Sequence, residues 1–279
     1  MMNKEILIST LIDEISMGPF GSDIKVDNFI NVGVPVLNGS NLVAYKLTEN
    51  SFRYVSEEKA NTYGKAIAKR GDIVITHRGT LGQISFIPTD SKFEKYVISQ
   101  SQFRVRFNDK KVSSQFIVYL FHTEYGQKKL LSFKNHVGVP ALAQATTNFK
   151  ALKLTLPDLT IQQKIASVLS KLDAKIELNN KINDNLEKIA KTLYDFWFVQ
   201  FDFPDKNGKP YKSSGGKMVW NEVLKRNIPE GWGYTELSDA LTIKYGKDYK
   251  KLNEGSIPVY GSGGIMKYVD TSIYDKEAI

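Results

Sequence analysis

Four short segments of the chain combine small polar residues with basic ones, a mixture that suits contacts to nucleic acid. They are Gly18–Ser22, Asn38–Asn41, Thr76–Thr80 and Lys134–Gly138. Arginine makes paired hydrogen bonds to guanine O6 and N7, and Asn or Gln makes them to adenine N6 and N7. Small hydroxyl and glycine residues let the backbone approach a phosphate closely. We therefore interpret these segments as candidate DNA-contacting loops.

The hypothesis rests on polar and basic residues in and beside these segments. Those suited to base edges are Asn38, Asn41, Arg78, Gln100 and Gln102, and those suited to phosphates are Ser22, Ser40, Thr80 and Lys134, with His77 beside Arg78. By itself, each is better explained as an ordinary turn or surface residue. The hypothesis therefore concerns the set.

Motifs for catalysis are missing from the sequence. It has no G-x-x-x-x-G-K-[ST] segment for a triphosphate and no G-x-G-x-x-G after a predicted strand. It also lacks the Asn-Pro-Pro-aromatic segment with which amino-methyltransferases hold a base, and the acid-x-Lys partner that a nuclease would need after Pro204. There is no cysteine, and the three histidines do not lie at metal-ligand spacing. We expect no catalytic residue, no metal site and no cofactor in this chain.

The net charge of +8 is unevenly distributed. Residues 1–156 contain 20 Lys or Arg against 13 Asp or Glu, whereas residues 157–203 contain 6 against 7. A basic domain beside a neutral helical segment suggests a polyanion partner for the first and a protein partner for the second. A solvated basic surface without a partner explains the same charge. No apolar run near Met1 is long enough for a signal peptide or a membrane span, so we expect a cytoplasmic protein.

Residues 1–156 mix predicted strands with predicted helices, which indicates an α+β domain. Strands are expected near 32–37, 73–75, 83–87 and 101–107, a weak helix over 56–68, and another helix from Ser113 or Ser114 to about Lys129. In 101–107 the alternation is regular, with Phe103, Val105 and Phe107 on one face.

The stretch from Thr160 to Phe198 predicts one long helix. Thr160 and Gln163 have the spacing of a capping box at its start. One apolar stripe runs along it at heptad spacing, interrupted near Lys175 and Asn179. The packing positions are Ile165, Leu172, Asn179, Ile182, Leu186, Ile189, Leu193 and Phe196. A single stripe on so long a helix needs a partner helix, and a core Asn commonly fixes the register of such a pair. A long core helix inside a globular domain is the alternative.

The chain after the helix repeats short segments of the first domain. Leu11–Ile15 has a counterpart in Leu237–Leu241, and Val34–Ser40 has one in Ile257–Ser262. We predict a first domain at 1–156, the long helix at 157–203, a linker at 204–230 and the start of a second domain at 231–279.

Taken together, these segments resemble the DNA-specificity subunit of type I restriction–modification enzymes. The residues that carry the resemblance are Gly18–Ser22, Val34–Asn41, Arg70–Val74, Arg78–Gly82, Pro140–Leu142, Leu156–Pro157, Gln162–Ile165 and Leu193–Phe198. The resemblance implies a non-catalytic chain with two target-recognition domains, each reading half of a split site on double-stranded DNA. The helices would set the spacing and dock modification subunits. S-adenosylmethionine, ATP and magnesium would belong to those methyltransferase subunits and to a separate restriction subunit, an endonuclease and translocase.

The chain departs from this pattern because its second recognition domain is cut short and a second long helix is missing. Two interpretations stay open: a truncated or recombining form, or two copies that pair through residues 160–198 and read a palindromic split site. A different function is also open, that of a coiled-coil protein-interaction adaptor without DNA specificity. A self-contained methyltransferase or nuclease is disfavoured by the missing motifs.

Overall fold

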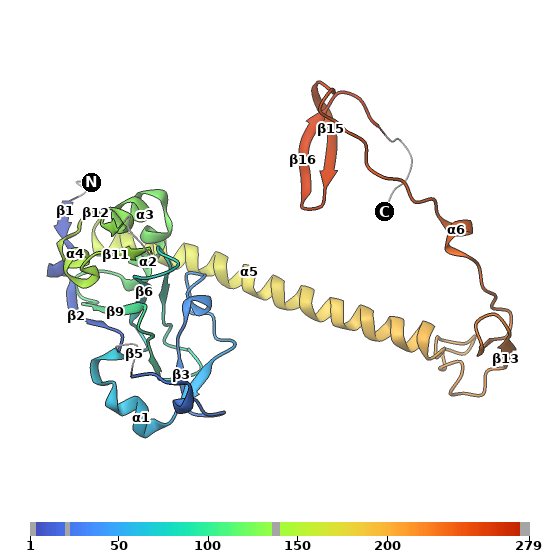
Figure 1. Ribbon diagram of the computed structural model, residues 1–279, viewed down its shortest axis with the longest axis horizontal. Coiled ribbons are helices and arrows are strands. Elements are labelled where there is room, and N and C mark those ends of the chain that lie inside the picture. Colours follow the sequence, from blue (N-terminus) through green and yellow to red (C-terminus); the bar gives the residue numbers. More distant parts are fainter. Residues whose placement is uncertain (1–3, 20–22, 136–139, 274–279) are drawn as a thin grey trace. The chain divides into compact units, whose positions relative to one another are not determined.

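The computed structural model describes residues 4–19, 23–135 and 140–273 (Figure 1). These residues form two compact units, Met1–Ile182 and Asn183–Ile279, and the division falls inside one long helix. Each unit is described by itself below.

The first unit is built on two four-stranded sheets. The first sheet has the order β2–β9–β6–β7, and the second has the order β4–β3–β8–β5. Their strands are β2 (Ile12–Met17), β3 (Val34–Val36), β4 (Arg53–Val55), β5 (Ile67–Lys69), β6 (Ile73–Thr76), β7 (Ile84–Phe86), β8 (Lys95–Val97) and β9 (Gln102–Phe107). All described pairings are antiparallel except that of β3 with β8.

The first sheet is buried on both faces. On β6, Ile73 and Ile75 join one apolar cluster, which includes residues of the helices, whereas Val74 joins the second cluster, formed mainly by the second sheet. Successive strand residues point to opposite faces, so one strand serves both cores. The mixed α+β class expected from the sequence is confirmed.

Four shorter helices and two strand pairs complete the first unit. They are α1 (Glu57–Thr62), α2 (Ser114–His122), α3 (Glu124–Leu131), α4 (Ala145–Ala151), and the pairs β1 (Lys4–Leu7) with β12 (Lys153–Leu156) and β10 (Lys134–Asn135) with β11 (Ala141–Leu142). Ser113 caps α2 as predicted, through its hydroxyl and the Phe116 N–H. The prediction of a single helix up to about Lys129 is wrong. Thr123 adopts an extended backbone conformation that ends α2, and its side chain caps α3.

The polar side chains of β9 are less exposed than alternation of polar and apolar residues in a strand suggests. Arg104 is only 4% exposed, and its guanidinium lies 2.8 Å from the Glu14 carboxylate and 3.4 Å from that of Asp72. Arg106 Nε lies 2.6 Å from the other oxygen of Asp72. Burial raises the pKa of Asp72, while the two arginines oppose that shift. An ion network with a buried centre at Arg104 and Asp72 therefore covers this face, where the sequence alternation suggests solvent.

Helix α5 (Leu159–Tyr194) has 36 residues and continues into a π-helical turn, Asp195–Val199. Figure 1 draws it as one unbroken ribbon. It begins one residue earlier than predicted. The Asp158 carbonyl accepts hydrogen bonds from the N–H groups of Ile161 and Gln162, so Thr160 already lies within the first turn. The predicted Thr160–Gln163 capping box therefore does not mark the helix start.

The apolar stripe of α5 is exposed along most of its length. Side chains at the predicted packing positions Ile165, Leu172, Ile182, Leu186, Ile189 and Leu193 are between 39% and 57% exposed. Asn179 is exposed among them, and Phe196 is half-buried in the π-helical turn. Only Gln162 and Ala166 of α5 are buried. The helix is therefore not a core helix of a globular domain.

The second unit contains two hairpins and a short helix. They are β13 (Met218–Asn221) with β14 (Arg226–Pro229), α6 (Leu237–Ala240), and β15 (Glu254–Gly261) with β16 (Gly264–Val269). Trp232 stacks on Phe203 with ring centres 5.2 Å apart, and Phe203 stacks on Tyr211 at 4.8 Å. The predicted linker at 204–230 thus contains a hairpin, and its Tyr211 packs on Phe203, which directly precedes it.

Candidate nucleic-acid interface

The loop that joins β6 to β7 lies at the centre of the candidate site. Its backbone is fixed by three hydrogen bonds: from His77 N–H to the Ser101 carbonyl at 2.8 Å, from Gly79 N–H to the Pro140 carbonyl at 2.9 Å, and from Leu142 N–H to the His77 carbonyl at 2.8 Å. Gly79 has φ +90°, a left-handed conformation that favours glycine. This loop therefore brings residues 76–82 together with 99–102 and 140–142.

Arg78 and Thr80 project from this fixed loop and are exposed. Arg78 forms an isolated bridge with Ala141, which lies on β11 beside β10. Lys134, at the first position of β10, is also exposed. Two exposed cationic residues therefore lie on adjoining backbone segments, Arg78 beside β11 and Lys134 on its partner strand β10.

His77 fastens the loop. Its Nε2 lies 3.0 Å from the Gln100 carbonyl oxygen, and because a carbonyl only accepts, the imidazole donates through that nitrogen. Burial lowers the pKa of His77, since the charged form would lose its hydration. The neutral imidazole thus holds the 99–102 segment, and Gln100 itself is exposed.

The turn at residues 38–41 is attached to the same loop. Gln83 Nε2 donates to the Gly39 carbonyl at 3.0 Å, and Gln83 Oε1 accepts from the Thr76 hydroxyl at 3.2 Å. Asn38 and Ser40 are exposed, and Asn38 Oδ1 accepts from both the N–H and the hydroxyl of Ser40. Two of the predicted loops therefore adjoin through one glutamine.

Two predicted base-contacting residues lie in the interior instead. Asn41 is 0% exposed, and its side chain accepts from the Asn38 N–H and donates to the carbonyls of Thr48 and Asn50. Gln102 is 1% exposed, and its Oε1 accepts from the Ser99 N–H at 3.0 Å. Burial leaves neither amide accessible to a base edge, so both hold turns. Ser22 and most of the loop after Lys134 lie outside the described residues.

Sequence reasoning missed the glutamines that hold the loop. Besides Gln83, Gln127 on α3 donates through Nε2 to the carbonyls of Gly82 and Phe121, at 2.9 and 2.7 Å. A glutamine in a polar loop or on a helix follows no periodic pattern, so nothing in the sequence singles these two out. Both glutamines bind backbone atoms. They hold the loop in shape, and the exposed side chains of the loop remain the candidates for contact with DNA.

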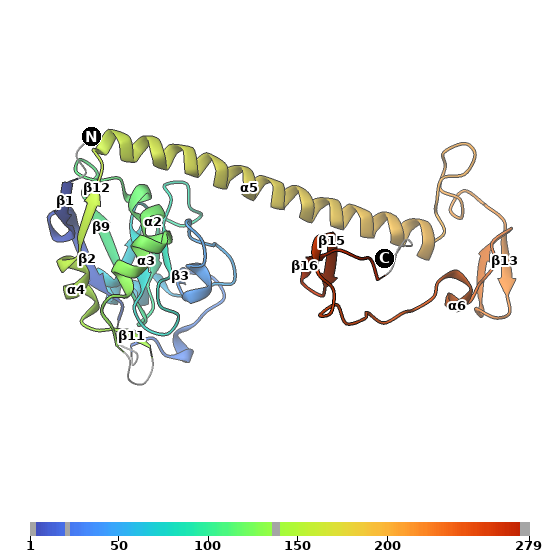
Figure 2. The ribbon, with the colours of Figure 1, turned by 90° about the horizontal axis from the view of Figure 1, so that it is seen from above.

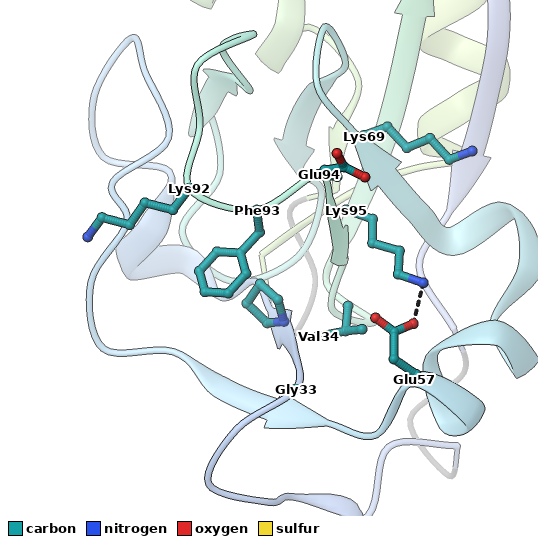
Figure 3. A pocket seen from close by; sticks show the side chains of 9 residues that line it. Gly33, Val34, Glu57, Lys69, Lys92, Phe93, Glu94 and Lys95 are labelled. Atoms are coloured by element: carbon teal, nitrogen blue, oxygen red, sulfur yellow. Dashed lines mark hydrogen bonds and ion pairs between the residues drawn. The ribbon is translucent and has the colours of Figure 1, made fainter.

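A cavity lies elsewhere in the first unit, beside β3 and β8. It has a volume of about 560 Å³, and Figure 3 shows the Lys95 ammonium paired with the Glu57 carboxylate at its wall. Lys69, Lys92 and Glu94 also line it. Within the described part of the chain, no group of three or more His, Cys, Asp or Glu is arranged to hold a metal ion, and no helix is long and apolar enough to cross a bilayer.

Comparison with known proteins gives the family. The model for the type I restriction modification DNA specificity domain matches residues 23–188, more than half of the chain. The chain belongs to this family. Within the specificity domain, the matched range covers the loops around Asn38 and Arg78 and most of α5.

Two curated relatives are specificity subunits. The chain is 28% identical over 231 residues to the type I restriction enzyme MjaIX specificity subunit of Methanocaldococcus jannaschii, covering 80% of this chain and 48% of that subunit. It is 34% identical over 195 residues to the HindI specificity subunit of Haemophilus influenzae, covering 68% of this chain and 41% of that subunit. The chain therefore spans about half the length of these relatives.

A solved structure shares the fold. The type I restriction-modification system S subunit from M. genitalium superposes with a TM-score of 0.57 at 16% identity, covering 98% of this chain and 63% of that one. At this identity the likeness concerns the specificity-domain fold alone.

Proposed function

We propose that this chain is the DNA-reading subunit of a type I restriction–modification complex, and that its first unit reads one half of a split site. The observation that carries the proposal is the backbone-fixed loop that exposes Arg78 and Thr80 beside Lys134, in a domain of the DNA specificity family. Arg78 has the chemistry to read a guanine, and Lys134 has the chemistry to contact a phosphate.

We propose a smaller set of contacts than the sequence alone suggests. Asn38, Ser40, Arg78, Thr80, Gln100 and Lys134 are exposed and remain candidates. His77 supports the loop, and the buried Asn41 and Gln102 are removed from the set. The proposed contacts thus come from four segments that adjoin in space.

The exposed stripe of α5 supports pairing with a second long helix. Six apolar side chains at one-third or more exposure on a single helix face are unusual unless another element covers them. We propose an antiparallel pair with α5 of a second copy, in which Asn179 sets the register. Such a pair gives the complex two recognition domains and a palindromic split site.

The β15–β16 hairpin supports the proposal that residues 231–279 begin a second recognition domain. Its strand register repeats that of β3 with β4, position for position. The pairs Ile257–Val269, Pro258–Tyr268 and Val259–Lys267 correspond to Val34–Val55, Pro35–Tyr54 and Val36–Arg53. An aliphatic-Pro-Val strand against a basic-Tyr-Val strand recurs in both, which favours duplication over a chance match.

The bond-making steps are assigned to other polypeptides. Modification subunits would dock on the helix and supply S-adenosylmethionine, and a restriction subunit would supply ATP- and magnesium-dependent cleavage. A chain that directs them to DNA works where the DNA lies, so we assign it to the cytoplasm.

Mapping methylated positions in DNA from cells with and without the gene for this chain tests the function. Loss of methylation at one split motif is the expected result. In vitro, specific binding should weaken linearly on a log–log plot against salt, since each phosphate contact releases counterions. Unchanged methylation, or no retention of DNA even at low salt, would contradict the proposal and favour the protein-interaction adaptor.

A further inference from the structure

Beyond its buried first turns, α5 contacts the rest of the first unit through polar side chains. The Tyr119 hydroxyl donates to Asp173 Oδ2 at 2.5 Å, and Lys46 Nζ lies 3.8 Å from Glu177 Oε2. Asp173 and Glu177 are four residues apart, so they lie on the same face of the helix. Figure 2 shows this part of α5 passing beside α2, which carries Tyr119.

Tyr119 is in turn held by the recognition unit. Its ring stacks on that of Tyr45, with centres 4.1 Å apart and planes inclined by 13°. Burial and the adjacent Asp173 carboxylate raise the pKa of Tyr119, so the phenol keeps the proton that it donates. Tyr45 is itself only 8% exposed, so the residues packed around it hold the stacked pair in place where Tyr119 contacts α5.

The segment that carries Tyr45 and Lys46 also carries the turn at residues 38–41. The Tyr45 carbonyl accepts from the Phe86 N–H at 2.8 Å, and the Leu47 N–H donates to the Phe86 carbonyl at 2.9 Å. These bonds attach the segment to β7, the strand that follows the Arg78 loop. One short stretch of chain therefore contacts both the helix and the candidate DNA-reading loops.

Contacts spread along one side of a helix fix its direction. In α5 they run from Gln162 and Ala166, which are buried, past the half-buried Leu169 and Ser170 to Asp173, about 16 Å beyond Gln162 along the axis. With 36 residues, α5 is about 54 Å long. A swing of about 5° at its start would move its far end by about 5 Å, which exceeds the roughly 3.4 Å rise of one base pair.

We propose that Tyr45, Lys46, Tyr119, Asp173 and Glu177 form a helix clamp, a set of positioning residues that determines how many base pairs the protein accepts between two half-sites. The inference rests on the proposed function, because it assigns a spacing role to the same DNA-reading unit. The clamp touches no DNA, and it acts through the direction in which α5 leaves the unit.

The test combines Tyr119→Phe with Glu177→Gln, which keep the side-chain shapes. They remove the Tyr119 hydrogen bond and the Lys46 ion pair, and also the pair of Glu177 with Lys181 inside α5. Binding is measured on DNA that carries the mapped site with its spacer shortened or lengthened by one base pair. The discrimination between spacers should fall by roughly tenfold, the change that corresponds to losing one charge-assisted hydrogen bond. Binding to a single half-site should stay unchanged. A matched control combines Tyr125→Phe and Glu187→Gln, which alter the same residue types outside the clamp.

A second measurement needs no DNA. Because the chain has no cysteine, Glu58→Cys on α1 and Asn180→Cys on α5 give two unique sites for spin labels on exposed positions. Electron–electron double resonance should give a narrow distance distribution that broadens in the clamp variant and not in the control. Unchanged spacer preference together with an unchanged distribution would overturn the clamp alone. Failure of the unaltered protein to bind any DNA motif would overturn the proposed function.

Discussion

Replacing Leu186 by alanine tests whether α5 pairs with a second helix. Leu186 lies at a core heptad position of the exposed stripe and is 57% exposed in the single chain. Alanine has the highest helix propensity, so the substitution removes apolar surface without weakening the helix itself. Any change in association then reports on the stripe.

The magnitude follows from the exposed fraction. Full burial of a leucine side chain contributes about 1.5–3 kcal/mol. Pairing can bury at most the 57% that is still exposed, which gives about 1–1.5 kcal/mol for each chain. A symmetric pair contains the residue twice, so Leu186→Ala should weaken association by about 2–3 kcal/mol, or roughly 30- to 150-fold in the dissociation constant.

Sedimentation equilibrium of the purified chain measures this constant, and far-ultraviolet circular dichroism verifies that the helix content is kept. Glu187→Ala is the matched control, since it changes the next residue along α5 to the same alanine off the stripe. A dissociation constant that is equal in Leu186→Ala and Glu187→Ala would refute the pairing argument, as would a strict monomer with and without modification subunits.

The remaining predictions concern the first unit. Arg78→Ala should reduce binding to the specific site by about 1–3 kcal/mol and leave random DNA almost unaffected, measured by fluorescence anisotropy. Lys134→Ala should weaken binding to all sequences and reduce the slope of log affinity against log salt by about one. Burial lowers the pKa of His77, so the unfolded chain binds this proton more readily. Unfolding free energy should therefore fall as the pH drops below about 6.5, and less so in His77→Gln. Urea titrations at several pH values measure it.

The controls separate these effects from general damage. Lys110→Ala removes an exposed cation beyond the far end of β9, so it should leave both the specificity and the salt slope unchanged. Equal losses of Arg78→Ala on specific and random DNA would argue against base reading. A salt slope unaltered in Lys134→Ala would remove that residue from the phosphate contacts. Identical pH profiles for His77→Gln and the unaltered chain would contradict the role of the buried imidazole.

Periodicity predicted those elements whose burial follows a simple pattern. The alternation around Phe103, Val105 and Phe107 gave β9, and the apolar spacing after Ile165 gave α5, because a strand and a helix each repeat their faces regularly. The same pattern did not reveal that the other face of β9 is also covered. Arg104 pairs with Asp72, a residue 32 positions away, and such a pairing follows from tertiary contact alone.

Residue type predicted the candidate site only in part. Arg78, Thr80 and Lys134 are exposed as expected, whereas Asn41 and Gln102 have the same chemistry as a base-reading residue but are buried. An amide that holds a turn and an amide that reads adenine look alike in a sequence, because both roles use the same donor and acceptor. Only the hydrogen bonds of Asn41 to Thr48 and Asn50 distinguish them.

The fixed backbone of the Arg78 loop has a consequence for how new specificities arise. Main-chain bonds shape residues 77–79, from His77 N–H to Ser101 and from Gly79 N–H to Pro140, and the His77 side chain adds a bond to Gln100. The side chains at 78 and 80 have no described part in that framework, so they can be exchanged without refolding the domain. Under the proposed function, point substitutions at these two positions would change the sequence preference, while the fold of the domain is kept.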